Sequence, residues 1–286
     1  MCKRSPLDPD LLSLSRRRFA VLGLATTLAA CAGGGMGSSA GLRERRVSIP
    51  TASGVMDGFF VHPKGETSAA VFLWPDIAGL RPAFEVMARR LAATGRAVLV
   101  VNQYYRTGPA PLFDDFAAFR EQDGFTKVRP WREALNPQAI AADTRAIVDW
   151  LDEQDEVDTN VGIGVQGYCM GGPFAFRSAT ARPDRIAAVA SFHGGGLVTD
   201  APDSPHRQLS DSKAAYLVAI AQDDDAEAPE NKSVLRGAMA ATGRPAEIEV
   251  YAGDHGWTVL DSPAYDADAA ERAFGRLRAL HDRVLG

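Results

Sequence analysis

One stretch constrains the fold of this chain more than any other, namely Gly-Val-Gln-Gly-Tyr-Cys-Met-Gly-Gly at residues 164–172. It contains the pattern Gly-x-Cys-x-Gly around Cys169. The apolar run at 161–165 predicts a strand before it, and the run at 173–179 predicts a helix after it. A nucleophile on a sharp strand-to-helix turn needs small neighbours, because larger side chains would collide with the helix and the next strand. The stretch therefore predicts a nucleophile elbow with Cys169 at its tip.

The helix predicted after Cys169 bears on its chemistry. The positive end of a helix dipole favours negative charge, which suits a thiolate or an oxyanion. Elbows of this kind usually carry Ser, whereas this chain carries Cys. The alternative interpretation is a buried structural cysteine among glycines that only pack, since free cysteines are often buried.

The rest of the chain predicts a single α/β domain with a mostly parallel central sheet and helices on both faces. Its 286 residues are 46% hydrophobic and 23% charged, which is enough for a large core. Strand and helix signals alternate along it. The strands are expected at 45–49, 55–62, 69–74, 97–101, 161–165, 186–192, 216–221 and 247–251. The helices are expected at 83–94, 140–151, 173–179, 230–241 and near 273–284. A long segment at 107–137 has no clear assignment, and segments of that length are usually functional or flexible.

Charge and cysteine content exclude several classes of protein. The net charge is -5 and no basic stripe occurs outside the N-terminus, so nucleic acid is not an expected partner. Three cysteines make no disulfide framework. The histidines are scattered without metal-ligand spacing, so neither a metal nor an organic cofactor is expected.

The first 31 residues resemble a bacterial export signal. Arg16, Arg17 and Arg18 precede an uncharged apolar stretch at 20–30, as in signals of the twin-arginine type. That stretch is shorter than the about 20 residues that a membrane-spanning helix needs. Leu-Ala-Ala-Cys at 28–31 resembles a lipobox, which predicts lipidation of Cys31. The alternative is cleavage without a lipid. Residues 32–44 are expected to form a flexible tether, and the protein is expected in the periplasm or anchored to a membrane.

A base and an orienting acid for Cys169 can be sought at the ends of later strands. Three acids, Asp223, Asp224 and Asp225, directly follow the strand expected at 216–221, and His255 follows the last strand. Nucleophile, acid and histidine in this order are typical of the α/β-hydrolase fold. In open α/β sheets these strand ends share one edge, where sites lie. The alternatives are a solvated acidic loop and a histidine without a role.

At this point the chain resembles the dienelactone hydrolase family over residues 45–286. The resemblance is carried by five motifs: Gly-Tyr-Cys-Met-Gly-Gly at 167–172, Pro-Asp-Ile-Ala-Gly-Leu at 75–80, Tyr-Tyr-Arg at 104–106, the acidic run at 223–225, and Asp-His-Gly-Trp at 254–257. It implies Cys169 as the nucleophile, His255 as the base and one of the three acids as its orienting group. We choose Asp224, because the family acid commonly lies three residues after a small residue that ends the strand.

The resemblance also assigns residues around the nucleophile. The family places a carboxylate, often Glu, beside the thiol, and Asp76 occupies that position here with a side chain one methylene shorter. The backbone N–H groups of Ile77 and Met170 would form the oxyanion hole. Arg106 matches an arginine that pairs with a substrate carboxylate; the alternative is a surface salt bridge. The pocket-lining candidates are Tyr105, His193 and Trp257.

The sequence therefore predicts an exported, monomeric hydrolase that cleaves a carboxylic ester or lactone through a thioester on Cys169. The expected partner is a small-molecule substrate, whose identity the sequence does not reveal. The alternative, from another class, is a surface lipoprotein that uses the hydrolase scaffold for binding alone. The elbow and His255 favour the enzyme.

Overall fold

The computed structural model of the chain describes residues 41–65 and 67–286. The predicted export signal at 1–31, with Cys31, and most of the predicted tether lie outside the described residues. Within the described part of the chain, no helix has both the length and the apolar character needed to cross a bilayer.

Eight strands form one sheet in the order β1-β2-β4-β3-β5-β6-β7-β8. The hairpin β1–β2 and the pair β2–β4 are antiparallel, and every other neighbouring pair is parallel. The strands are β1 (Leu42–Thr51), β2 (Gly54–Pro63), β3 (Ala70–Trp74), β4 (Ala97–Val101), β5 (Ile163–Tyr168), β6 (Ile186–Phe192), β7 (Ala215–Ala221) and β8 (Ala246–Tyr251). The predicted mostly parallel α/β sheet is confirmed. The first strand begins at Leu42, before the expected 45, because its pairing with β2 runs as far as Leu42 opposite Pro63.

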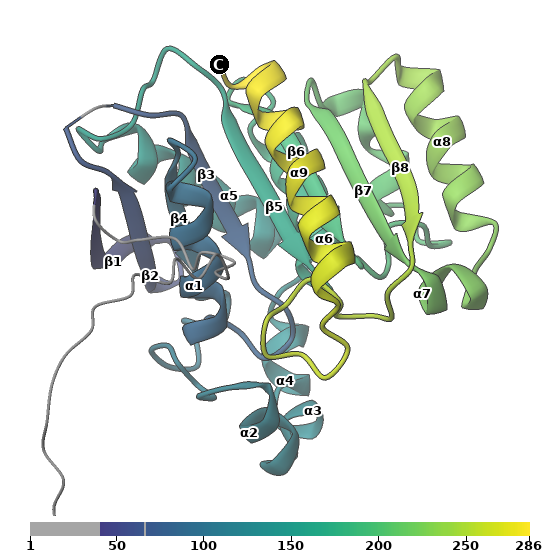
Figure 1. Cartoon of the computed structure of the whole chain (residues 1–286), viewed down its shortest axis with the longest axis horizontal. Coiled ribbons are helices and arrows are strands. Elements are labelled where there is room, and N and C mark those ends of the chain that lie inside the picture. The colour runs from purple at the N-terminus through teal and green to yellow at the C-terminus, as the bar shows by residue number, and fades with distance from the viewer. Residues whose placement is uncertain (1–40, 66) are drawn as a thin grey trace, which may run out of the picture. The chain divides into compact units, whose positions relative to one another are not determined.

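The central strands are buried along their whole length because both faces of the sheet are covered. Every residue of β3, β4 and β5 is buried, as expected of parallel strands between two helical layers. One core lies under α1 (Pro82–Ala92) and α9 (Ala267–Val284), and the other lies under α5 (Pro137–Asp152), α6 (Gly171–Ala181) and α8 (Asn231–Thr242). Figure 1 shows α1 and α9 in front of the sheet and α5 and α6 behind it.

Helix boundaries follow local sequence signals. Asn136 caps α5 by accepting the Ala139 N–H, and Pro137 occupies the first turn, where no N–H is needed. Asp266 caps α9 in the same way. Gly243, in the left-handed conformation with φ of 65°, ends α8.

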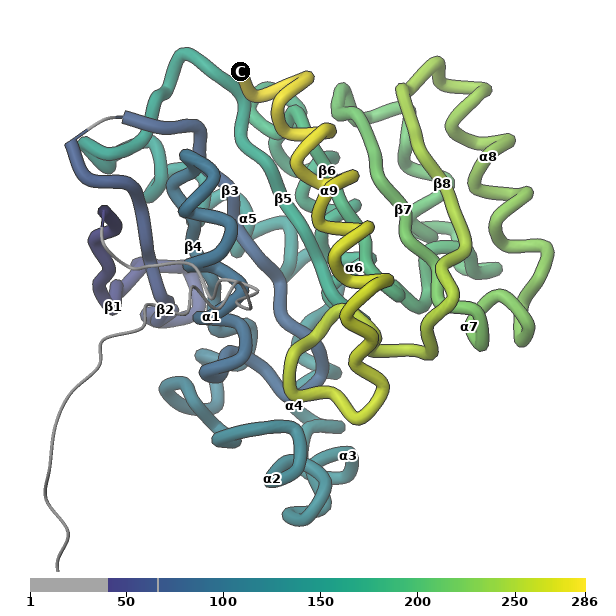
Figure 2. The backbone as a smooth tube through the Cα atoms, viewed as in Figure 1, coloured from purple at the N-terminus to yellow at the C-terminus, as the bar shows by residue number. Residues whose placement is uncertain are grey.

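The parallel strands end at one edge of the sheet, and the segments that follow them gather there (Figures 1 and 2). The long segment at 107–137 contributes three short helices to this edge, α2 (Phe116–Glu121), α3 (Gly124–Lys127) and α4 (Arg129–Glu133). Two short 3-10 helices follow β6, Pro205–Arg207 and Leu209–Asp211. The acidic run after β7 forms a helix, α7 (Gln222–Glu227), instead of the expected loop.

Candidate active site

Cys169 lies at the tip of a sharp turn between β5 and α6. Its φ is 54°, in the left-handed region that L-residues other than Gly rarely adopt. A Cβ on Gly167 would lie 1.8 Å from the carbonyl oxygen of Gly171, and a Cβ on Gly171 would lie 2.3 Å from that of Trp74. Only glycine fits at either position, so the packing explains the Gly-x-Cys-x-Gly pattern. Cys169 is a free, half-buried thiol at this turn.

The three consecutive acids after β7 have three different partners. The Asp223 carboxylate accepts the backbone N–H of His255 at 2.9 Å. Asp224 accepts the Nδ1–H of the His255 ring at 2.8 Å. Asp225 forms an ion pair with Lys232 at 2.7 Å. Of the three, only Asp224 contacts the imidazole ring, as its predicted role requires.

His255 is held in its protonated form by its two neighbours. The hydrogen bond to Asp224 and the nearby Cys169, opposed by partial burial, raise the pKa of His255 to about 10. Its Nδ1 is committed to Asp224, which leaves Nε2 for proton exchange with the thiol or a substrate. The arrangement therefore brings together a thiol, an imidazole and a carboxylate.

Two predicted pocket residues, His193 and Trp257, are buried near His255. His193 and Trp257 both have an exposed fraction of 0%. The ring of His193 packs edge-to-face on that of His255, and its Nε2 shares a hydrogen bond of 2.8 Å with Thr258. Burial, with the nearby charge of His255, lowers the pKa of His193 well below its usual value, so this ring is neutral. The place of both residues in a substrate pocket stays a prediction; in this structure His193 packs against His255, and Trp257 packs against His193 and Tyr251.

Two backbone donors flank the elbow as the oxyanion hole would require. Among the described residues, neither the Ile77 N–H nor the Met170 N–H has a hydrogen-bond partner. The loop that carries Ile77 is held on several sides: Tyr104 donates its hydroxyl to the Ile77 carbonyl at 3.0 Å, and Gln103 donates to the Asp76 carbonyl at 2.8 Å. The loop is thus fixed while its N–H remains available.

The Asp76 side chain is bound to Arg81. Its two oxygens accept from the Arg81 guanidinium at 2.7 and 2.9 Å, and one of them also accepts the Ala78 N–H at 2.9 Å. No hydrogen bond joins Asp76 to Cys169 within residues 41–65 and 67–286. The expected interaction of Asp76 with the thiol stays a prediction, and in this structure the carboxylate orders its own loop.

Arg106 and Tyr105 share one buried partner on α5. Both terminal nitrogens of Arg106 donate to Asp143 at 2.8 Å, and the Tyr105 hydroxyl donates to the same carboxylate at 2.8 Å. The Asp143 side chain is only 1% exposed. The guanidinium fork expected to hold a substrate carboxylate is thus already occupied. Arg106 therefore forms a salt bridge, as the alternative interpretation expected, but its partner Asp143 is buried and not at the surface.

An open groove of about 430 Å³ begins at Met170, the residue that follows Cys169. Its apolar wall includes Pro173 and Phe174, and α4 contributes Arg129 and Arg132. Neither arginine has an ion pair or a side-chain hydrogen bond to another described residue. The positive charge of Arg132 acts to lower the pKa of Tyr104, against a larger increase that burial causes. The Tyr104 hydroxyl donates to the Met170 sulfur at 3.6 Å. The groove is therefore the candidate substrate site.

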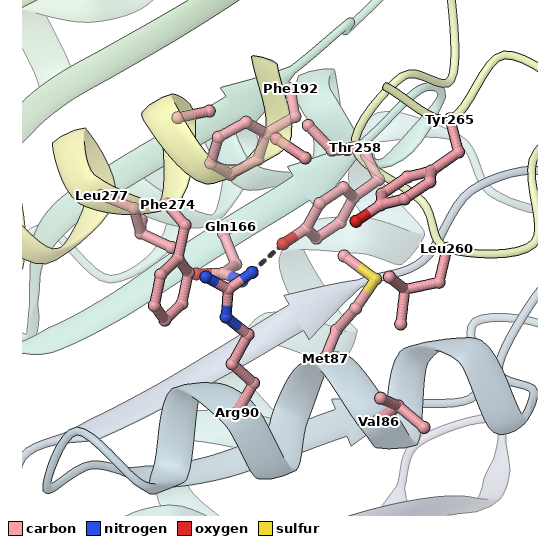
Figure 3. Close-up of a pocket in the computed structure, with 13 residues that line it drawn as sticks. Val86, Met87, Arg90, Gln166, Phe192, Thr258, Leu260, Tyr265, Phe274 and Leu277 are labelled. Atoms are coloured by element: carbon pink, nitrogen blue, oxygen red, sulfur yellow. Dashed lines mark hydrogen bonds between the residues drawn. The ribbon is translucent and has the colours of Figure 1, made fainter. Parts of the chain in front are cut away.

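A small cavity of about 60 Å³ lies on the other side of β5, between α1 and α9 (Figure 3). Its wall is mostly apolar, with Arg90 of α1 facing Phe274 of α9. Within it the Gln166 amide donates to the Tyr168 hydroxyl at 2.8 Å. Tyr168, the residue before Cys169, lines this cavity, whereas Cys169, Asp224 and His255 do not.

The fold and the elbow, acid and histidine at one edge of the sheet define an α/β-hydrolase. The model of the dienelactone hydrolase family matches residues 56–284. The chain belongs to the dienelactone hydrolase family and is a hydrolase of carboxylic esters or lactones.

Individual relatives agree with this assignment. The carboxymethylenebutenolidase of Rhodococcus opacus is 25% identical over 218 residues, which cover 74% of this chain and 80% of that protein. A Klebsiella pneumoniae protein named after the dienelactone hydrolases has the same fold, with a TM-score of 0.71, 21% identity, and coverage of 84% of this chain and 98% of that one. A promiscuous phosphotriesterase from metagenomic libraries also shares the fold, with a TM-score of 0.66 and 22% identity, covering 86% of this chain and 100% of that one.

Sequence reasoning missed two residues of this region. Arg81 is completely buried between Asp76 and Asp261. An arginine directly before Pro82, at the end of a loop that carries an expected site residue, is a weak signal that could have singled it out. Asp261 has no such signal, because an acid in a polar loop is ordinary.

Proposed function

We propose that this hydrolase works through Cys169, His255 and Asp224. The observation that carries the proposal is the 2.8 Å hydrogen bond from the His255 ring to Asp224, in a site where Cys169 lies near enough to help raise the pKa of that ring. Asp224 fixes the orientation of the ring and stabilises its protonated form. The positive charge that the raised pKa keeps on His255 stabilises negative charge on the attacking sulfur.

The reaction follows from this geometry in two halves. The Cys169 sulfur forms a bond to the substrate carbonyl carbon, and the oxyanion that results accepts hydrogen bonds from the backbone N–H groups of Ile77 and Met170. The carbon–oxygen bond to the leaving group then breaks, and imidazolium His255 protonates the departing oxygen, leaving a thioester. Neutral His255 next takes a proton from water, whose oxygen attacks the thioester, and the acid is released as the thiolate and imidazolium return.

The test is to trap the thioester. The protein is mixed with a small nitrophenyl ester, quenched in acid within a second, and digested for mass spectrometry. We expect the acyl mass on the peptide that contains Cys169 and on no other cysteine peptide. Turnover without an acylated Cys169 would contradict the thioester route. No turnover and no acylation with any ester or lactone would favour the alternative of a binding lipoprotein.

The two arginines of the groove support a substrate that carries a negative charge near its reacting carbonyl. In contrast to Arg106, they have no carboxylate partner in the described part of the chain, while Glu133 is the one acid that lines the same groove. A charge-assisted hydrogen bond to a carboxylate typically contributes about 1.5–3 kcal/mol. Selectivity for anionic esters over neutral ones should therefore depend on α4.

Matched alanine variants distinguish the two arginine positions. Arg132→Ala should raise KM for an anionic ester about tenfold relative to its neutral isostere, with an unchanged melting temperature. Arg106→Ala should leave that ratio unchanged and lower the free energy of unfolding by about 3 kcal/mol, because it leaves Asp143 buried without its cation. Steady-state kinetics and urea unfolding measure both. A selective KM effect at Arg106 alone would instead support the role that the family resemblance implies.

For the N-terminal region we propose export by the twin-arginine route and lipidation of Cys31. The support is the sequence pattern alone, Arg16 and Arg17 before an apolar stretch that ends in Leu-Ala-Ala-Cys at 28–31. Radiolabelled palmitate should enter the protein in a bacterial host, and Cys31→Ala should prevent it. Arg16→Lys with Arg17→Lys should leave the precursor inside the cell. An exported protein without label would mean cleavage without lipidation.

A further inference from the structure

Arg81 joins two loops of the site through a completely buried guanidinium. Its side chain has an exposed fraction of 0%. One edge donates to both oxygens of Asp76 at 2.7 and 2.9 Å, and the other donates to both oxygens of Asp261 at 2.8 Å. The remaining N–H donates to the Gly79 carbonyl at 3.1 Å. All five donors that a guanidinium possesses are therefore used.

The two carboxylates belong to segments that are far apart in the sequence. Asp76 lies in the loop between β3 and α1, directly before Ile77. Asp261 lies in the segment that follows β8, six residues after His255. One oxygen of Asp261 also accepts the N–H of Phe116, the first residue of α2. The guanidinium thus connects the loop that carries Ile77 with the segment that carries His255 and Asp261, and through Asp261 it also reaches the start of α2.

The network fixes the orientation of the Ile77 backbone N–H, which is the proposed oxyanion donor. The residue before it is fixed by the Asp76 carboxylate on Arg81, and the residue after it, Ala78, donates its N–H to that same carboxylate. The peptide plane that carries the Ile77 N–H is therefore held by groups on both sides. Oxyanion stabilisation depends on such fixed donors, and removal of one typically costs about 10²–10³ in kcat.

Burying one cation and two anions is not an efficient way to stabilise a fold, since apolar side chains of the same volume often stabilise a protein as well or better. Such a cluster instead provides specific geometry, because two hydrogen bonds from the guanidinium to each carboxylate fix both the position and the orientation of that carboxylate. We infer that Arg81 is a positioning residue, which with Asp261 holds the Ile77 N–H in place relative to His255. The inference rests on the proposed function, because it assigns Ile77 to the oxyanion hole.

Two variants test the positioning role of Arg81. Asp261→Asn removes the charge of one carboxylate with the smallest change of shape, and Arg81→Lys keeps the positive charge but loses the paired hydrogen bonds of the guanidinium. Both should lower kcat for a neutral aryl ester, about 10- to 100-fold, with KM changed less than twofold. The inhibition constant of a trifluoromethyl ketone, whose adduct with Cys169 carries an oxyanion, should rise by the same factor. Alkylation of Cys169 by iodoacetamide creates no oxyanion, so its rate should stay within twofold of wild type.

Asp282→Asn is the matched control. Asp282 pairs with Arg96 at 3.0 Å, and Arg96 is likewise buried, but that pair joins the start of β4 to the end of α9. The control should keep kcat and ketone binding. The inference is overturned if Asp261→Asn lowers the melting temperature but keeps kcat, or if iodoacetamide alkylation slows as much as turnover. Failure to trap a thioester in the wild-type protein would instead refute the proposed function, so the two failures are distinguishable.

Discussion

Replacing Cys169 with Ala is expected to lower kcat for small aryl esters by at least roughly 10⁴-fold, because removal of a catalytic nucleophile usually eliminates most of the rate enhancement. The fold should persist. Alanine keeps a Cβ in the same place, so the strained φ of 54° at this turn costs about the same in both proteins. Steady-state assays, with the free energy of unfolding measured in urea, check both expectations.

Cys169→Ser is the accompanying control. Its hydroxyl fits the same elbow and should retain weak esterase activity, well below that of the thiol. Residual activity above about one per cent in Cys169→Ala would exclude Cys169 as the nucleophile. A wild-type-like rate in that variant, with an intact fold, would direct the search toward another nucleophile at this edge of the sheet.

Asp224→Asn is expected to lower kcat by roughly 10²- to 10⁴-fold, since the amide cannot hold the imidazole in its orientation or stabilise the imidazolium. Asp223→Asn and Asp225→Asn are matched controls with the same change of charge. They should have mild effects, because Asp223 contacts only the backbone of His255 and Asp225 pairs with Lys232. Three equal, mild losses would mean that the acidic run is only a solvated surface.

The same variant should alter how stability depends on pH. The pKa of His255 is raised from its usual 6.5 to about 10 by Asp224 and Cys169, so the protonated ring stabilises the folded state. That contribution is fully present below pH 6.5 and is lost as pH rises through about 10. Asp224→Asn should remove part of this decline. A decline of equal size in the variant would assign it to other groups.

Much of the fold follows from local sequence. The runs in β3 and β4 are apolar throughout, which suits only a strand covered on both faces, and the spacing of Gly167, Cys169 and Gly171 suits only a tight strand-to-helix turn. The order of nucleophile, acid and histidine then places the site at the carboxyl ends of the strands. These features are short-range, so the sequence carries them without knowledge of distant contacts.

The partners of individual charged side chains depended on the tertiary structure. Asp223, Asp224 and Asp225 are locally equivalent, but on α7 successive side chains point about 100° apart, and so reach a backbone N–H, an imidazole and a lysine. Arg106 matches the family arginine, yet it pairs with Asp143, 37 residues away. Arg81 meets Asp261 across 180 residues. Sequence alone determined the fold of this protein and the tight turn that carries Cys169. Only the tertiary structure decided which acid hydrogen-bonds the His255 ring and which arginines are already paired, because ion pairs between distant residues leave no local pattern.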